Sequence, residues 1–300
     1  MGILGYSNGK FNLTIKGAVL MSKAVDNTEI IEHYQGNNLY ESIVDGLRKA
    51  GLNMDNLSPE NLSAADEFHI GGTEATDFVC DKVGDFAGQK LLDVGCGIGG
   101  PARFISNRMG CEVVGVDLTP DFVRTGNLLT GLVSMTNAVT LMEGNAAELS
   151  FPPSSFDAAY MMHVGMNISD KKGTFKEVNR VLKDRGLFVI YDVMCLKEQQ
   201  LTYPLPWASN KEGSAVDAPE TYQSILEAED FEVTEIDVKR DFAVAFFENM
   251  MKKMEGGPPP LGLHLVMGSN TALKVQNVHR QIVDGLLAPV LMVAKKRIQK

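Results

Sequence analysis

A glycine-rich turn joins a short apolar segment to the expected start of a helix in the first half of the chain. The turn lies within LLDVGCGIGGP, residues 91–101, where small residues allow the backbone to bend sharply and to pass close to a ligand. Asp117 ends the next apolar segment, 20 residues after Gly97. A carboxylate at this position accepts hydrogen bonds from two ribose hydroxyls. Because the turn and the acid occur together, the pattern predicts a nucleoside site rather than a turn without a ligand.

Short apolar segments alternate with amphipathic segments along the rest of the chain. Strands are predicted at 91–94, 112–117, 139–142, 156–163, 186–193, 231–238 and 287–294, and helices at 101–109, 120–135, 170–182 and 219–229. Such alternation is typical of a parallel sheet covered by helices on both faces. We therefore expect an α/β fold with a Rossmann-like, doubly wound and mostly parallel seven-stranded sheet.

The segments outside this alternation divide the chain into three regions. Residues 1–24 are expected to form a flexible tail and residues 25–84 a helical cap. Residues 85–300 are expected to form the ligand-binding domain, interrupted by insertions at about 196–218 and 242–284. The cap and both insertions are predicted to make a helical cover at the carboxyl edge of the sheet, where open α/β sheets bind ligands.

The chain is acidic, with 28 Lys and Arg against 38 Asp and Glu, a net charge of −10 at pH 7. Nucleic-acid affinity rests on Lys and Arg, so we expect no nucleic-acid partner. No apolar run reaches the roughly 20 residues of a membrane span. The four cysteines form neither a CxxC pair nor a zinc pattern, so we expect no metal and a cytoplasmic location, with a weak organelle transit peptide as the alternative. A small-molecule substrate and a monomer or homodimer are expected.

Two cofactors compete for the glycine turn. Gly95, Gly97 and Gly100 fit the G-x-G-x-x-G pattern of nicotinamide dinucleotide sites. Asp93, Gly95, Gly97 and Gly99 fit D-x-G-x-G-x-G, the first motif of the class I S-adenosylmethionine (SAM) methyltransferases, which this stretch resembles. Further family marks follow in order: GNA at 144–146, LSFP at 149–152, SFD at 155–157 and VLKDRG at 181–186. The resemblance covers roughly residues 85–240 and implies S-adenosyl-L-methionine as the cofactor.

The same resemblance implies which residues hold the cofactor. Asn145 stands where the family often has Asp beside the adenine, and its amide oxygen can accept the same hydrogen bond without a charge. A turn role for Asn145 stays equally open. The predicted cofactor contacts are Asp93, Gly95, Cys96, Gly97, Gly99, Asp117, Leu118, Asn145, Ala146, His163, Gly71 and Gly72.

Four other segments narrow the substrate class. Residues 68–72, 162–168, 191–194 and 203–207 resemble glycine, sarcosine and dimethylglycine N-methyltransferases and, more distantly, phosphoethanolamine N-methyltransferases. This resemblance implies methyl transfer to the nitrogen of a small polar metabolite. An O-, S- or C-methyltransferase acting on a thioether, quinone, sterol or polyketide-like molecule is the main alternative. A nicotinamide-dependent oxidoreductase and a non-catalytic SAM-binding module stay as further alternatives.

Two histidines are the candidate catalytic residues. His163 follows the fourth predicted strand, and His69 lies in a glycine-flanked loop, so each could take or orient a proton of an amine nucleophile. Each could equally be a packing histidine. The candidate substrate contacts are Tyr34, Met166, Asn167, Tyr203 and Trp207, since aromatic faces favour ammonium groups and Met lines adaptable pockets. For a substrate carboxylate, the candidate partners are Arg103, Arg240 and Arg280.

Overall fold

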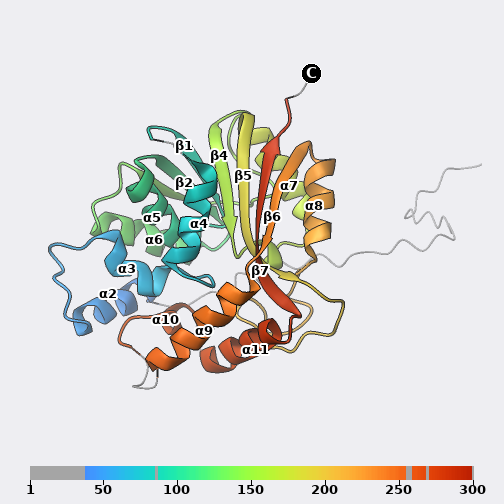
Figure 1. Cartoon of the computed structure of the whole chain (residues 1–300). Coiled ribbons are helices and arrows are strands. Elements are labelled where there is room, and N and C mark those ends of the chain that lie inside the picture. Colours follow the sequence, from blue (N-terminus) through green and yellow to red (C-terminus); the bar gives the residue numbers. More distant parts are fainter. Residues whose placement is uncertain (1–37, 85–86, 255–258, 268–269, 299–300) are drawn as a thin grey trace, which may run out of the picture.

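The computed structural model describes residues 38–84, 87–254, 259–267 and 270–298 (Figure 1). The strands are β1 (Lys90–Val94), β2 (Glu112–Asp117), β3 (Val139–Glu143), β4 (Phe156–Met162), β5 (Leu182–Cys195), β6 (Phe231–Val238) and β7 (Leu287–Lys296). The helices are α2 (Leu39–Lys49), α3 (Pro59–Asp66), α4 (Thr73–Val83), α5 (Gly100–Met109), α6 (Pro120–Leu132), the short η1 (Gly165–Asn167), α7 (Lys171–Val181), α8 (Pro219–Ala228), α9 (Arg240–Met254), α10 (His264–Met267) and α11 (Thr271–Val283). The predicted tail, the start of the predicted cap and Tyr34 lie outside the described residues.

The strands form one sheet in the order β3-β2-β1-β4-β5-β7-β6. The pairs from β3 to β5 are parallel, whereas β7 runs antiparallel to both β5 and β6. This is the predicted doubly wound, mostly parallel seven-stranded sheet, so the expected fold class is confirmed. The strand order reverses between β1 and β4, and ligands bind at such a switch point in open α/β sheets.

Side chains alternate between two buried faces of the sheet, as the two-residue period of a strand requires. Leu92 and Ala159 point into the core that packs against α7 and α8. Leu91 and Ala158 point into the core under α4 and α5 on the other face. Because both faces are buried, the central strands are almost wholly apolar, and that continuous apolar character made them recognisable in the sequence.

Several helices begin at positions that residues with helix-starting preferences mark in the sequence. Proline occupies one of the first two positions of α3, α5, α6 and α8, where its missing N–H costs nothing. Ser58 and Asn61 also form a capping box at the start of α3. Other boundaries differ from the prediction. Helix α6 ends at Leu132 rather than at 135, and strand β5 begins at Leu182 rather than at 186.

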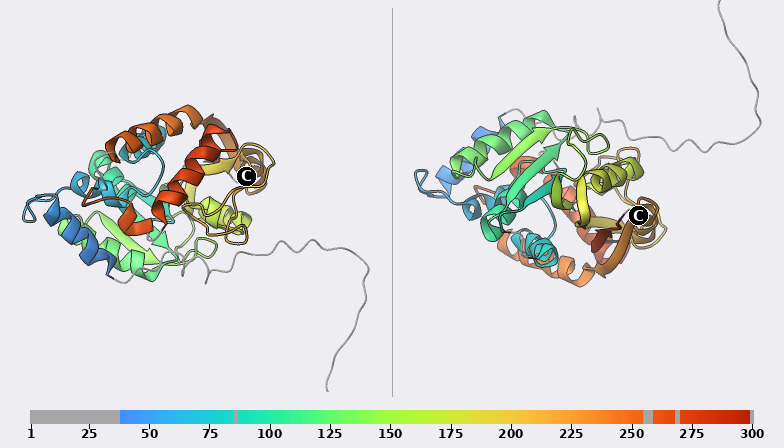
Figure 2. Two further views of the ribbon diagram at one scale, coloured as in Figure 1. Left: turned by 90° about the horizontal axis from the view of Figure 1, so that it is seen from below. Right: turned by 90° about the horizontal axis from the view of Figure 1, so that it is seen from above.

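Helices cover the carboxyl edge of the parallel strands. In Figure 1, α9, α10 and α11 lie together below the sheet, with α2 and α3 beside them, and the left view of Figure 2 looks onto this edge. The apolar faces of α9 and α11 share a buried cluster with the ends of β5 and β7 and with Trp207 from the 196–218 segment. The predicted helical cover is therefore present at this edge, while residues 196–218 contribute an irregular segment rather than a helix.

Candidate functional site

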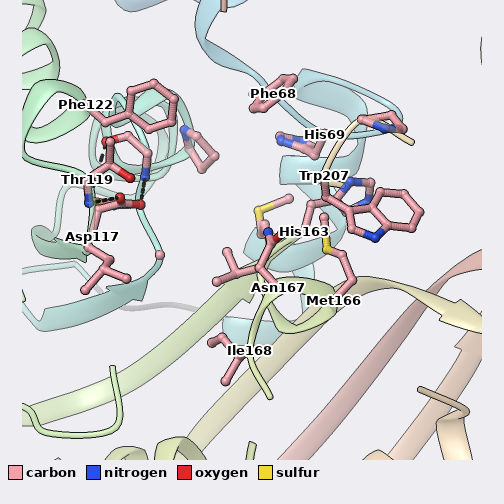
Figure 3. A pocket seen from close by; sticks show the side chains of 18 of the residues that line it. Phe68, His69, Asp117, Thr119, Phe122, His163, Met166, Asn167, Ile168 and Trp207 are labelled. Atoms are coloured by element: carbon pink, nitrogen blue, oxygen red, sulfur yellow. Dashed lines mark hydrogen bonds between the residues drawn. The ribbon is translucent and has the colours of Figure 1, made fainter. Parts of the chain in front are cut away.

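A cavity of about 560 Å³ lies between the strand ends of β1, β2 and β4 and the cover. Its volume falls within the roughly 300 to 1,000 Å³ typical of small-molecule sites. Figure 3 shows two groups of side chains facing this space: Asp117, Thr119 and Phe122 on one side, and His69, His163 and Trp207 on the other. We refer to these as the cofactor end, built on the glycine turn and Asp117, and the substrate end, built on His163, Asn167 and Trp207.

The glycine turn is bent in a way that side chains oppose. Gly95 and Gly97 both have positive φ, at 77° and 52°. A Cβ on Gly95 would collide with Val164, so the turn packs directly on the loop that follows β4. A Cβ on Gly97 would meet no protein atom within 4 Å, and Gly97 lines the cavity. The open space beside Gly97 is therefore a place where a ligand can approach the backbone closely.

Asp117 closes the cofactor end from the tip of β2. Its carboxylate accepts hydrogen bonds from the Gly97 N–H at 2.8 Å and from the Thr119 N–H at 2.9 Å, drawn as dashed lines in Figure 3. Burial raises the pKa of Asp117, and these two N–H donors oppose that rise. Each oxygen retains a further lone-pair direction, so the carboxylate can also accept hydrogen bonds from a ligand.

Asp93 is the second acid at this end and lies at the heart of the sheet, only 2% exposed. Within the described part of the chain, its Oδ2 atom has no hydrogen-bond partner. Burial raises the pKa of Asp93 to about 8, and the nearby Asp117 adds to the rise. A buried carboxyl oxygen without a partner is costly, so Asp93 is suited to a cationic or N–H-bearing ligand group.

The remaining predicted cofactor residues divide by position. Cys96, Leu118, Asn145 and Ala146 line the cavity. The Asn145 side-chain oxygen accepts the Ala147 N–H at 2.9 Å, so Asn145 fulfils the turn role while also facing the cavity.

Three glycines lie outside the lining. Gly99 is the N-cap of α5, and Gly72 is the N-cap of α4. Gly71 is required for packing, because a Cβ there would come within 2.6 Å of the Phe242 ring. The structure therefore gives these three glycines backbone and packing roles.

The two candidate histidines lie side by side, with ring centroids 5.9 Å apart. His69 Nε2 is 3.0 Å from the Gly72 carbonyl oxygen, which can only accept, so Nε2 carries the proton and Nδ1 the lone pair. Burial lowers the pKa of His69 to about 4. His163 stacks on Tyr191 at 5.4 Å, and burial together with His69 lowers the pKa of His163 well below its usual range. Both rings are therefore neutral at pH 7.

His163 has an unusual backbone and an unsatisfied ring. Its φ is 54°, a left-handed conformation that few non-glycine residues adopt. Its Nε2 atom is buried and, within the described ranges, has no hydrogen-bond partner. Asn167 Oδ1 is also buried and also lacks a hydrogen-bond partner among the described residues, and both residues line the cavity. Strain and unsatisfied polar atoms together make this loop a candidate functional site.

Three of the predicted substrate contacts, Met166, Asn167 and Trp207, line the cavity, whereas Tyr203 does not. Tyr203 instead packs against the cluster of the cover. Among the lining residues that sequence reasoning missed, six apolar ones come from the helical cover: Phe246, Phe247, Leu263, Val266, Met267 and Val278. Their helical spacing is equally typical of ordinary core packing, so the sequence offered no signal to single them out.

None of the three candidate arginines reaches the cavity. Arg103 is fully buried and pairs with Asp66 at 2.8 Å, with further bonds to the Gly126 and Ile98 carbonyls. Arg240 binds the carbonyls at the end of α11, and Arg280 is exposed. Among the described residues that line the cavity, none is Lys or Arg, and the charged ones are Asp66, Asp93, Asp117 and Asp170.

Comparison with known proteins agrees with this geometry. Residues 92–190 match the family described as a methyltransferase domain. A sterol 24-C-methyltransferase of Yarrowia lipolytica is 33% identical over 127 residues, which is 42% of this chain and 33% of that protein. The chain thus spans about a third of the length of the curated relatives it matches.

Solved structures extend the likeness to the whole fold. Geranyl diphosphate C-methyltransferase from Streptomyces coelicolor superimposes with a TM-score of 0.67 at 17% identity, over 90% of this chain and 97% of that one. Phosphoethanolamine N-methyltransferase 2 of Haemonchus contortus gives a TM-score of 0.66 at 20% identity, over 80% of this chain and 58% of that one.

The glycine turn, the acid at the end of β2 and this sheet order define a methyltransferase domain. The matched region covers about a third of the chain, and its features resemble those of the class I SAM-dependent methyltransferases. No helix within the described ranges is both long and apolar enough to span a membrane.

Proposed function

We propose that this protein transfers the methyl group of SAM to a small molecule bound beneath the helical cover. The observation that carries the proposal is that one cavity joins the glycine turn and Asp117 to the loop of His163 and Asn167. A shared, mostly apolar space suits methyl transfer, because the nucleophile and the methyl group must be held in line while water is excluded.

The residues present fit the cofactor. The open space beside Gly97 would receive the backbone-contacting part of the nucleoside, and Asp117 would accept the ribose hydroxyls. Asp93, whose Oδ2 lacks a partner among the described residues, would accept from the amino group of the methionine portion. When bound, SAM supplies an electrophilic methyl group on a positively charged sulfur.

His163 is the residue we propose to act at the acceptor. Its neutral ring borders the cavity at the end of β4. The next residue, Val164, packs against Gly95 of the glycine turn. A neutral imidazole can accept or orient the proton of a hydroxyl or amine nucleophile as the new bond to carbon forms. His69, whose Nε2–H is occupied by the Gly72 carbonyl, would support the His163 ring from behind rather than touch the acceptor.

Two acceptor classes follow from the resemblances and relatives. The sequence favours a small polar amine, in line with the likeness to a phosphoethanolamine N-methyltransferase. A bulkier apolar acceptor methylated on O, S or C is the second candidate, and the apolar residues of the cover at the substrate end support it.

Cofactor binding is tested by calorimetry with SAM, S-adenosylhomocysteine (SAH) and NADH. We expect SAM and SAH to bind with dissociation constants between about 1 μM and 1 mM, the usual range for enzyme substrates. Heat from NADH together with none from SAM would contradict the proposal. Transfer of labelled methyl from SAM across a panel of amines, thioethers, phenols and sterols then identifies the acceptor atom.

The role of His163 is tested with the acceptor found in that screen. We expect His163→Ala to lower turnover about 100-fold while leaving SAH affinity nearly unchanged. His264→Ala, a histidine of α10 outside the cavity lining, is the matched control. A His163 variant that loses melting temperature but keeps its turnover per folded molecule would show a packing role instead.

A further inference from the structure

The wall of the substrate end is a hydrocarbon surface drawn from several parts of the chain. Met166 comes from η1, Trp207 from the 196–218 segment, Phe247 from α9, Val266 from α10 and Val278 from α11. Met166, Trp207, Phe247 and Val278 also belong to one buried apolar cluster, so they hold each other in place. A ligand at this end would exchange water for aliphatic and aromatic contacts over most of its surface.

The charges that face the cavity all have one sign. The described lining includes Asp66, Asp93, Asp117 and Asp170 and contains neither Lys nor Arg. The nearest buried guanidinium, that of Arg103, is already held by Asp66 and by backbone carbonyls. A carboxylate or phosphate placed here would lose its water without gaining a cation from the described lining, which makes its binding strongly unfavourable.

Two polar atoms at this end need a partner. Asn167 Oδ1 and His163 Nε2 are buried, and the part of the chain that the structure describes offers neither a hydrogen bond. An amide oxygen can only accept, so its partner must be a hydroxyl or an N–H group. Figure 3 shows His163 and Asn167 close together at the end of β4, so one such group could serve both.

From these three observations we infer that the acceptor is a non-anionic molecule with a hydrocarbon body and one hydroxyl or N–H group, as in an aliphatic alcohol or a phenol. This inference rests on the proposed function and narrows its substrate class. It favours the apolar acceptor over amino-acid and phosphoethanolamine acceptors, because each of the latter brings an anionic group to a wall whose described residues include no Lys or Arg.

The test uses a built-in reporter, since Trp207 is the single tryptophan of the chain and lines this end of the cavity. Its fluorescence is titrated with octan-1-ol, octanoate and octyl phosphate at pH 8 in the presence of SAH. The three probes carry straight alkyl chains of about seven or eight carbons and differ chiefly in the head group. We expect octan-1-ol to bind at least about 10-fold more tightly than either anion. Equal or tighter binding of octanoate or octyl phosphate would overturn the inference.

Changing the charge of the wall sharpens the test. Val266→Lys is expected to tighten octanoate binding about 10-fold or more by giving the carboxylate a cation, whereas the neutral control Val266→Met is not. Phe246→Lys makes the same change from α9 if Val266→Lys does not fold. Asn167→Ala should weaken octan-1-ol several-fold and leave octanoate unaffected. An octanoate affinity that Val266→Lys and Phe246→Lys both leave unchanged would count against the inference.

Calorimetry on the same samples separates this inference from the proposed function. If SAH binds and octanoate is preferred, the substrate class is wrong while the methyltransferase proposal stands. If neither SAM nor SAH binds, the proposed function fails, and the inference fails with it.

Discussion

The two ends of the cavity are built from different materials. The cofactor end is shaped by backbone conformation and short-range hydrogen bonds. Gly97 leaves open space beside the backbone, and its N–H donates a hydrogen bond to Asp117. At the substrate end, side chains from segments far apart in the sequence, such as Met166, Trp207 and Val278, form the surface. A site made of backbone tolerates few substitutions, whereas a wall of apolar side chains can change its shape one residue at a time.

That difference explains why fold and cofactor were easier to infer than substrate. The backbone geometry of the cofactor end leaves glycines at fixed spacing, which can be read directly from the chain. The substrate end leaves only apolar residues at helical spacing, which resemble any core. The experiments below probe this contrast through cofactor affinity, from the largest expected effect to the smallest.

Substitution of Gly97 is expected to cause the largest loss of SAH affinity. Gly97→Ala places a methyl group in the space beside the turn, so we expect SAH affinity to fall about 100-fold, close to 2.7 kcal/mol. Gly88→Ala is the matched control, because Gly88 also has positive φ, at 72°, with no atom within 4 Å of a Cβ, but lies outside the cavity lining. Both variants should lose similar stability on heating. Equal loss of SAH affinity in both would mean that strain, not access, governs binding.

Removing the ribose acceptor should have the next largest effect. Asp117→Ala is expected to raise the SAH dissociation constant about 10-fold or more, since charge-assisted bonds contribute about 1.5 to 3 kcal/mol each. Asp117→Ala also leaves the Gly97 N–H without its acceptor. Asp117→Asn keeps an acceptor oxygen, so it should lose less SAH affinity. Calorimetry on both variants provides the measurement. Unchanged affinity in a folded Asp117→Ala protein would place the ribose elsewhere.

The acid in the sheet should make cofactor binding depend on pH. Asp93 has a pKa of about 8 in the free protein, so at pH 7 it is mostly protonated and must lose its proton to pair with an ammonium group. SAH affinity should therefore rise about 5-fold from pH 7 to pH 8, with proton release visible as a buffer-dependent heat. Asp93→Asn should abolish the proton release. A flat profile in the unmodified protein would contradict this role.

A buried lysine should affect the substrate end while sparing the cofactor end. Lys171 Nζ binds the Ile168 carbonyl at 2.9 Å, the Ala215 carbonyl at 2.5 Å and Asp217 at 2.8 Å. It therefore ties the loop of Asn167 to the segment that carries Trp207. Lys171→Met should lower the free energy of unfolding by about 1 to 3 kcal/mol, because it leaves buried acceptors unpaired.

The same variant should expose Trp207 to acrylamide quenching and change SAH affinity less than about 2-fold, a difference under 0.5 kcal/mol. Lys172→Met is the control, since the Lys172 side chain is 74% exposed. If SAH affinity falls as far as stability does, the two ends are not independent.

The sheet and the cofactor end could be predicted because their signals are local. The strands at 112–117 and 231–238 have the predicted bounds, and Asp117 lies beside the glycine turn, where its carboxylate accepts the Gly97 N–H. β5 starts early because Leu182 pairs with Phe156 across a bulge, and its charged residues Lys183 to Arg185 hid that extension. Bulges depend on the partner strand and leave no pattern in the sequence.

The side-chain partners at the substrate end could not be predicted because they are distant in sequence. Arg103 was a candidate for a substrate carboxylate, yet its partner is Asp66, 37 residues earlier. Tyr203 and Trp207 belong to the same aromatic-rich segment, but only Trp207 faces the cavity. Which residue of an irregular segment points inward is decided by packing against the cover, and no periodicity reports that packing.

The position of β7 has a consequence for how the molecule is made. β7 lies between β5 and β6, although it follows both in the chain. During synthesis β6 emerges with no neighbour to pair with, and the edge of β5 stays open until β7 arrives. The helices α9, α10 and α11 lie between β6 and β7, so the roof of the cavity and the missing strand emerge together. The glycine turn and Asp117 therefore precede in the chain both the helices that cover the cavity and the strand that joins β5 to β6.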